Sequence, residues 1–437
     1  MKPNPKSEIR NPKSLAGKAR EGRLALLGGP KAKAAPYGKG MRFGREELKE
    51  LKEALAQNTL FYAKGQKVRG FCRDFAAKYR KKHALATTSG TAAIHVALGA
   101  VGVTVGDEVI TSVLQDAGGF VPILYQNAVP VFADVDPRTY CMTADTIAAK
   151  LTRRTKALVV PHWAGTPADM DPILRLARKH DLWVIEDCAQ SWNARYKGRL
   201  VGTMGDIGCF SLNDFKHISV GDGGAVLIDN PALADRAALF ADKCYPRDLF
   251  GRRTGEMCQF LAPNYRMSEL SGAVALAQLR KLDWICDRRR RYGETLTRLV
   301  RDVPGILPPM APPRSESTCW YYLFRVDEKA LGVSRDEFVK ALAAEGVPAG
   351  FYLRRVDQLP MFQDRTIYPP RKDKFTCPYD CPGYGGKVSY RAAECPNVDV
   401  VMRTGVIIPM SEFYTAQDVR QTGAAIRKVA AYYASRT

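Results

Sequence analysis

The chain has 437 residues, which is long for one hydrophobic core and suits a large domain with a smaller one. Hydrophobic residues make up 46% and charged residues 25%, as in ordinary globular proteins, and no stretch approaches the roughly 20 apolar residues of a membrane span. The first 25 residues are polar and basic and lack the apolar core of a signal peptide. We therefore expect a cytoplasmic protein with no membrane partner.

The net charge is +21, and residues 1–40 hold ten lysines and arginines against two glutamates. Together with Pro3, Pro5 and Pro12, this composition predicts a mobile basic arm. A charge of this size can indicate nucleic-acid binding, but no zinc-finger or RNP-like motif accompanies it. We therefore favour a solvated surface that steers anionic substrates, and do not expect a nucleic-acid partner.

Eleven cysteines are scattered from Cys72 to Cys395, too sparsely for the disulfide framework of a small secreted protein, so we expect reduced thiols. Cys377 and Cys381 lie four residues apart in CPYDCPGYGG, with Cys395 further on. This spacing lacks a CxxC pair and a nearby histidine. The five histidines are His83, His95, His162, His180 and His217. We therefore predict no metal site.

Five apolar runs alternate with polar helical stretches between about residues 85 and 230. The runs span residues 107–113, 129–135, 156–163, 182–188 and 207–212, and the stretch 170–180 is typical of a helix. Because each run is apolar throughout, it suits a strand that is covered on both faces. Strands alternating with helices predict a mostly parallel sheet in a three-layer α/β domain. Ligands of such sheets bind beyond the carboxyl ends of the strands.

The second half of the chain predicts a smaller α+β domain. A basic helical stretch begins near residue 275, a Pro-rich break follows at 304–313, and residues 356–396 predict a long loop rich in Pro, Gly, Tyr and Cys. Loops of that length often have a functional or lid-like role. We therefore divide the chain into a basic arm at 1–40, a large domain at 41–285 and a small domain at 286–437.

Small and charged residues stand near the predicted strand ends. Ser89, Gly90 and Thr91 precede an apolar helical segment, and the N–H groups of a helix start can hold a phosphate, although Ser and Thr are equally ordinary helix caps. Asp187 ends the run LWVIED, where a carboxylate is costly without a partner such as a protonated pyridine nitrogen. Gln190 could donate to a phenolic oxygen on the same ring.

Lys216 follows the strand that ends at Ser211 and precedes a Gly-rich turn at 221–224. Lysine forms Schiff bases when burial or nearby cations lower the pKa of its amine, and glycines let the backbone fold closely around it. Asn264 and Arg266, in PNYRMSEL, begin a helix and could reach an anion, including one in a neighbouring subunit. Each signal alone equally fits a surface residue or a helix start, but their order and spacing together are more specific.

In this combination the chain resembles the DegT/DnrJ/EryC1/StrS family, the sugar and cyclitol aminotransferases that use pyridoxal phosphate (PLP) and share the aspartate aminotransferase fold, fold type I. The matching pieces include SGTAAIHVAL, GDEVIT, LYQNAVPVFADVD, HWAGTPADMDPI, VIEDCAQSW, GDGGA and NYRMSEL, and they cover about residues 40–285. The segment LALLGGPKA near the start also resembles the branch that includes inosose aminotransferases.

The resemblance implies a role for each matching residue. Lys216 holds PLP as an internal aldimine and then moves the proton between the two carbons that flank the nitrogen. Asp187 pairs with the pyridinium, and Gln190 with the ring hydroxyl. The phosphate lies at the helix start that follows Ser89, and its contacts are Gly90, Thr91, Ser211 and, from the second subunit of a homodimer, Asn264.

Asp116, His162 and Arg266 are candidates for the substrate side of the site. His162 lies at a strand end that the family places near the cofactor, although a packed histidine fits there equally well. Asp116 is a departure, because the family typically carries an aromatic residue there that stacks on the pyridine ring. A neighbour such as Trp163 or Phe120 covers the ring instead, or the pocket is adapted to another substrate, or efficient transamination is lost.

The activity that the resemblance implies is transfer of an amino group from glutamate or glutamine to a keto-cyclitol or a keto-sugar, free or nucleotide-linked. One alternative is the sister activity of a PLP-dependent sugar dehydratase, in which a histidine usually replaces the lysine, so Lys216 argues against it. The other alternative is a regulatory homologue that binds PLP without turnover. Asp116 is the feature that favours this last reading.

Overall fold

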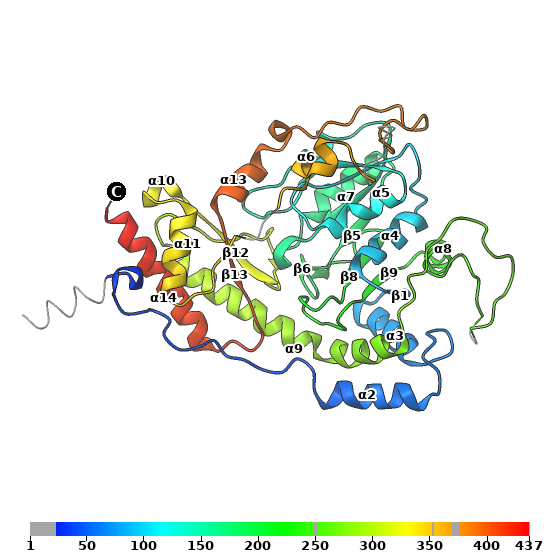
Figure 1. The fold of residues 1–437 in the computed structure, drawn as a ribbon, viewed down its shortest axis with the longest axis horizontal. Coiled ribbons are helices and arrows are strands. Elements are labelled where there is room, and N and C mark those ends of the chain that lie inside the picture. Colours follow the sequence, from blue (N-terminus) through cyan, green and yellow to red (C-terminus); the bar gives the residue numbers. More distant parts are fainter. Residues whose placement is uncertain (1–22, 249–250, 352–353, 369–375, 437) are drawn as a thin grey trace, which may run out of the picture.

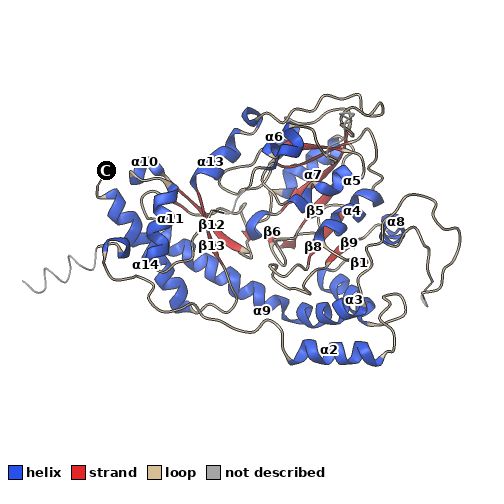
Figure 2. Ribbon diagram, in the orientation of Figure 1, coloured by secondary structure: helices blue, strands red, loops and turns tan. Residues whose placement is uncertain are grey.

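The computed structural model describes residues 23–248, 251–351, 354–368 and 376–436. Its larger part is built on a seven-stranded sheet in the order β1-β9-β8-β5-β4-β2-β3 (Figures 1 and 2). The strands are β1 (His83–Thr87), β2 (Glu108–Ser112), β3 (Val129–Ala133), β4 (Thr155–Pro161), β5 (Trp183–Asp187), β8 (Ile207–Ser211) and β9 (Gly224–Ile228). The five predicted apolar runs are thereby confirmed as strands, and the predicted helix at 170–180 is α7 (Met170–Lys179).

The sheet is mostly parallel, as predicted. Strands β3, β2, β4, β5 and β8 pair in parallel, and β9 alone runs against its neighbours β8 and β1. The carboxyl ends of the parallel strands and of β1 therefore lie at one edge of the sheet. The residues that follow these strands, including Lys216 after β8, are brought to that edge.

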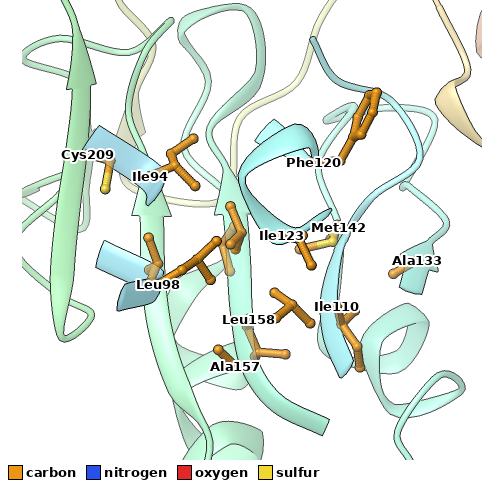
Figure 3. Close-up of a cluster of buried hydrophobic side chains, with 14 of the residues drawn as sticks. Ile94, Leu98, Ile110, Phe120, Ile123, Ala133, Met142, Ala157, Leu158 and Cys209 are labelled. Carbon is orange, nitrogen blue, oxygen red and sulfur yellow. The ribbon is translucent and has the colours of Figure 1, made fainter. Parts of the chain in front are cut away.

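Both faces of the sheet are covered, which makes the domain three-layered. In β8, Ile207 and Cys209 join one apolar cluster, whereas Phe210 joins another with α3 (Lys67–Tyr79) and α9 (Glu269–Val300). The first cluster contains α4 (Gly90–Ala100), whose Ile94 and Leu98 lie among core side chains of the strands (Figure 3). Continuous apolar strands arise because neither face meets water.

Helix α9 is 32 residues long and runs from the large sheet to a smaller sheet (Figure 1). That sheet has the order β10-β12-β13 and is covered by α11 (Arg335–Ala344) and α14 (Ala416–Ala434). Its strands are β10 (Ile306–Leu307), β12 (Tyr321–Val326) and β13 (Gly405–Pro409). The boundary predicted at 285/286 falls inside α9.

The remaining elements are shorter or peripheral. The helices are α2 (Arg45–Ala56), α5 (Val121–Tyr125), α6 (Ala144–Ala148), α8 (Pro231–Ala241), α10 (Glu328–Leu331), α12 (Pro360–Gln363) and α13 (Pro396–Thr404). A third sheet pairs β11 (Ser315–Glu316), β6 (Arg195–Tyr196) and β7 (Arg199–Leu200). Among the described residues, no helix combines the length and apolarity needed to cross a bilayer.

The Tyr- and Cys-rich segment predicted as a long loop is mostly irregular where it is described, but it packs on the large sheet. The Tyr384 hydroxyl donates to Glu108 of β2 at 2.7 Å, and the Tyr390 hydroxyl donates to the carbonyl of Pro130 in β3 at 2.8 Å. Both tyrosines are buried in the same cluster as the sheet. The segment therefore covers the β3 edge of the large domain, although the sequence places it with the small one.

The basic arm differs from its prediction over residues 23–40. Lys33 is buried and pairs with Asp418 of α14 at 2.8 Å, and the Tyr37 hydroxyl lies 2.7 Å from that of Thr422. From there the segment runs along the molecule toward α2 (Figure 1). A basic residue with a buried acidic partner does not behave as part of a solvated tail. Residues 1–22 of the predicted arm lie outside the described residues.

Candidate active site

A cavity of about 640 Å³ opens at the carboxyl edge of the large sheet. Nine of the eleven candidate residues from the sequence line this cavity, although they are spread over residues 89–216 of the chain. They are Ser89, Gly90, Thr91, Asp116, His162, Asp187, Gln190, Ser211 and Lys216. We define this cavity as the Lys216 pocket.

Lys216 lies on the loop after β8, with its ammonium nitrogen 4.2 Å from the centre of the Trp320 ring. The Trp320 indole N–H donates to the carbonyl of Phe215 at 2.7 Å, which holds the ring beside the lysine loop. Burial lowers the pKa of Lys216, and the carboxylates of Asp187 and Asp116 oppose that shift. A lowered pKa raises the fraction of neutral amine, the form that attacks an aldehyde.

Asp187 closes β5 and enters the same pocket. One carboxylate oxygen accepts the N–H of Ala189 at 3.0 Å. Burial raises the pKa of Asp187, and that N–H and Lys216 act in the opposite direction. Gln190 is oriented by its carbonyl oxygen, which accepts the N–H of Ala164 at 2.9 Å. The amide NH₂ of Gln190 is therefore its remaining polar group, and it can only donate.

The start of α4 and the end of β8 approach each other closely. A Cβ atom at Gly90 would lie 2.7 Å from the Cβ of Ser211, so this approach requires glycine. The Ser89 hydroxyl accepts the N–H of Ala92 at 3.0 Å and so serves as the helix cap. The backbone N–H groups of Gly90 and Thr91 and the Ser211 hydroxyl remain as donors for an anion at this corner.

His162 is held by hydrogen bonds at both ring nitrogens. Its Nδ1 accepts the N–H of Ala168 at 3.0 Å, so the ring proton sits on Nε2, 3.0 Å from Glu186. The imidazole is therefore neutral, and neither nitrogen is left to transfer a proton to a ligand. His162, Glu186 and Cys188 are the one grouping of possible metal ligands within the described part of the chain, but these hydrogen bonds already use the imidazole and the carboxylate.

Glu186 is a functional neighbour that the sequence analysis missed. Its carboxylate is fully buried and also accepts three backbone N–H groups, from Gly202, Met204 and Gly205, at 2.6–2.8 Å. Burial alone would raise the pKa of Glu186, but His162 and these donors hold it below its ordinary value. An acid inside the apolar run LWVIED was the available signal, because a buried carboxylate needs partners.

Asn264 and Arg266 do not line the Lys216 pocket of their own chain. The Arg266 guanidinium donates to Asp242 at 3.0 Å, and the Asn264 side chain accepts the N–H of Arg266 at 3.5 Å. The structure therefore brings these two residues to each other, outside the lining of the Lys216 pocket. A role for Asn264 in a second subunit stays a prediction.

Of the two neighbours expected to replace an aromatic residue at position 116, only one lines the pocket. Phe120 belongs to the buried cluster drawn in Figure 3. Its ring packs against those of Phe132 and Phe362, so it is not available to cover a bound ring. Trp163 lines the pocket. Asp116 itself is exposed at the pocket and caps the short helix Ala117–Gly119 by accepting the N–H of Gly118 at 3.0 Å.

Further lining residues went unnoticed in the sequence. They include Gln115, Asn213, Phe215, Asp222 and Trp320. Asp222 belongs to the Gly-rich turn that was singled out for its glycines. Trp320 precedes β12 of the small domain, about a hundred residues after Lys216, and carries no local signal for this site.

The donor set fits the cofactor that the resemblance implies. PLP presents an aldehyde, a pyridinium nitrogen, a ring hydroxyl and a phosphate. The Lys216 pocket offers an amine of lowered pKa, the Asp187 carboxylate, the Gln190 NH₂ and the N–H corner at Gly90. Each group of the cofactor thus has a partner of complementary chemistry on a different element of the fold.

Comparison with known proteins identifies the family of this chain. A protein of Streptoalloteichus tenebrarius, provisionally named L-glutamine:3-amino-2,3-dideoxy-scyllo-inosose aminotransferase, is 34% identical over 79% of this chain and 81% of its own. The spore coat polysaccharide biosynthesis protein SpsC of Bacillus subtilis is 36% identical over 69% of this chain and 78% of its own. The solved structure of an aminotransferase from Psychrobacter cryohalolentis superposes with a TM-score of 0.79, at 28% identity over 91% of this chain and all of that one. The model of the DegT/DnrJ/EryC1/StrS aminotransferase family matches residues 42–378, and the chain belongs to that family.

Proposed function

We propose that this protein is a PLP-dependent aminotransferase that moves an amino group from glutamine or glutamate to a keto-cyclitol or a keto-sugar. The observation that carries the proposal is the position of the Lys216 amine, which shares one pocket with the Asp187 carboxylate and the N–H groups at Gly90. The relatives named for inosose and polysaccharide pathways favour an acceptor of the cyclitol or sugar class.

Each residue has a defined task in this proposal. Lys216 would hold the cofactor through Nζ, and its free amine would move a proton between the two carbons that flank the transferred nitrogen. Asp187 keeps the ring nitrogen protonated, and Gln190 donates to the ring oxygen. Gly90, Thr91 and Ser211 hold the phosphate. The bound cofactor supplies an electron sink for the carbon that loses its proton.

The proposed assembly is a cytoplasmic homodimer in which Asn264 of each subunit completes the pocket of the other subunit. Asn264 is exposed and lies outside its own pocket, which supports a contact in another subunit. Mixing Lys216→Ala with Asn264→Ala subunits should then restore part of the activity, because one pocket of each mixed dimer carries both native residues. Verified mixed dimers with no recovery would contradict the shared site.

A dehydratase is less well supported, because its family members usually carry histidine where this chain has Lys216. The neighbouring His217 does not substitute for it, since His217 is buried and does not line the pocket. A regulatory homologue would bind PLP but transfer nothing. Turnover with an amino donor separates that reading from the proposal.

The test is the cofactor spectrum of purified holoprotein. Bound PLP should absorb as a protonated Schiff base, and addition of glutamine or glutamate should convert the spectrum to that of the amine form. Lys216→Ala should abolish the first signal, whereas Lys197→Ala, which removes a surface lysine paired with Asp171, should retain it. An unchanged spectrum in Lys216→Ala, or no response of the wild type to any amino donor, would refute the proposed function.

A further inference from the structure

The loop that carries Lys216 lies between β8 and β9 and forms neither helix nor strand. Both carbonyls that directly precede Lys216 are bound by side chains from distant parts of the chain. The carbonyl of Asp214 accepts a guanidinium N–H of Arg42. The carbonyl of Phe215 accepts the indole N–H of Trp320 at 2.7 Å. Because irregular segments keep one conformation only where such contacts hold them, these two bonds bear directly on the place of the Lys216 amine.

The Trp320 contact is anchored in the small domain and on α9. Thr318 precedes β12 with Trp320, and its carbonyl accepts the Nε2–H of His217 at 3.3 Å. The Arg289 guanidinium of α9 donates to the carbonyl of Trp320 at 3.3 Å and to Glu412 at 2.7 and 2.9 Å. Arg289 and Glu412 are both buried, so a charge-assisted pair fixes the segment that holds the loop.

The Arg42 contact is fixed by the other half of α9. The carbonyl of Arg42 accepts the amide NH₂ of Gln278 at 3.0 Å and the ammonium of Lys281 at 3.4 Å. The Gln278 carbonyl oxygen in turn accepts the N–H of Ser219, on the same loop as Lys216, at 3.4 Å. Arg42 does not line the Lys216 pocket. An effect of Arg42 on the reaction therefore has to pass through the loop.

Arg42 ends a segment that is docked on the small domain, residues 24–42, which we name the strap. The strap begins with LALLGGPKA, the motif that no part of the cofactor site uses. The buried carboxylate of Glu345 accepts the N–H groups of Ala25 and Ala32 at 2.8 Å each. Further along, Asp418 accepts the N–H of Gly38 at 3.0 Å, beside its ion pair with Lys33. The strap thus ties the small domain to the loop that carries the reactive amine.

We propose that Arg42 is a positioning residue for Lys216, and that the strap carries this contact from the small domain to the lysine loop. Proton transfer requires the Lys216 amine within hydrogen-bond reach of the reacting carbon, and a misplacement of about 1 Å can cost about a hundredfold in rate. The Arg42 bond holds the backbone beside Lys216 in the place from which the amine reaches. This inference rests on the proposed function and gives the basic segment before α2 a role in it.

The test follows the donor half-reaction of the holoenzyme in single turnovers, with glutamine or glutamate as the donor. Arg42→Met removes the N–H donor but keeps an apolar stem. Arg427→Met is the matched control, since Arg427 also donates to a backbone carbonyl, that of Leu299, at 3.0 Å. We expect the limiting rate constant to fall at least about tenfold in Arg42→Met. The donor concentration at half-saturation should stay within about twofold, because no bound ligand loses a contact. Both values should be unchanged in Arg427→Met.

Two further measurements separate positioning from a merely structural role. Loss of folded enzyme lowers the amplitude of the spectral change but not the rate constant of the molecules that still react. Deuterium at the α-carbon of the donor should slow Arg42→Met by at least the same factor as the wild type, because proton transfer limits the rate. Arg42→Lys, which keeps one cationic donor on a differently shaped side chain, should have an intermediate rate constant. This variant keeps the test decisive if Arg42→Met does not fold.

The outcomes bear separately on the inference and on the proposed function. A wild-type rate constant in either folded Arg42 variant would overturn the inference and leave the aminotransferase intact. A fall in amplitude alone, or a slower reaction that has lost its isotope effect, would overturn it as well. A wild type that responds to neither amino donor would remove the proposed function itself.

Discussion

Glu186 offers the sharpest test of the hydrogen bonds that hold His162 at the Lys216 pocket. Its two carboxylate oxygens accept four donors: Gly202 N–H and His162 Nε2 reach one oxygen, while Met204 and Gly205 N–H reach the other. In Glu186→Gln an NH₂ group replaces one of the two oxygens. In either orientation of the amide, this group faces two N–H donors and cannot accept a hydrogen bond from them. Each orphaned buried donor costs about 1–3 kcal/mol, so the variant should lose about 2–6 kcal/mol of unfolding free energy.

The assay is denaturant unfolding of the apoprotein, with Glu108→Gln as the matched control. Glu108 is a buried acid of the same sheet, but its partners are the hydroxyls of Thr152 and Tyr384, which can rotate to accept from an amide. We therefore expect a smaller loss for Glu108→Gln. Since neither variant touches Lys216, both should still form the Schiff-base spectrum with PLP while folded. A loss below about 1 kcal/mol for Glu186→Gln would refute the count of orphaned donors.

Two further variants test other contacts. Gly90→Ala gains up to about 1 kcal/mol of helix propensity but places a Cβ atom 2.7 Å from that of Ser211, and such overpacking typically costs about 1–3 kcal/mol. Titration with PLP should show weaker binding to Gly90→Ala than to the control Gly350→Ala, where an added Cβ meets nothing within 4 Å. Equal PLP binding by the two variants would contradict the close approach of Gly90 and Ser211. Lys33→Met should cost about 3 kcal/mol, because it leaves Asp418 without its buried cation. Burial alone would raise the pKa of Asp418, but Lys33 and nearby N–H donors lower it to about 2. The ionised carboxylate of Asp418 therefore contributes fully to the free energy of unfolding above about pH 4, and this contribution is lost as the pH falls toward 2. Acid titration of unfolding should show a flatter dependence in this variant, and an unchanged profile would argue against the pair.

Much of the large domain could be predicted from the sequence, because its signals are local. Strands that are covered on both faces need unbroken apolar runs, and parallel strands need helices between them, so residues 107–212 identify the sheet directly. The same rule places Asp187, Ser211 and Lys216 at one edge, because the first two end strands β5 and β8 and Lys216 follows β8. Ser89 also lies at the pocket, although its hydroxyl caps helix α4.

Contacts between distant segments needed the tertiary structure. Trp320 reaches the pocket from the small domain, and the neutral state of His162 depends on Ala168 and Glu186. Basic composition predicts a solvated arm, but burial of Lys33 depends on a partner almost four hundred residues away. Sequence by itself determined five of the seven strands of the large sheet and the order of the expected cofactor residues, because strand burial and turn chemistry are local. Which side chains share the pocket, and with what charge, was decided only by the fold, because electrostatic balance is set by distances in space.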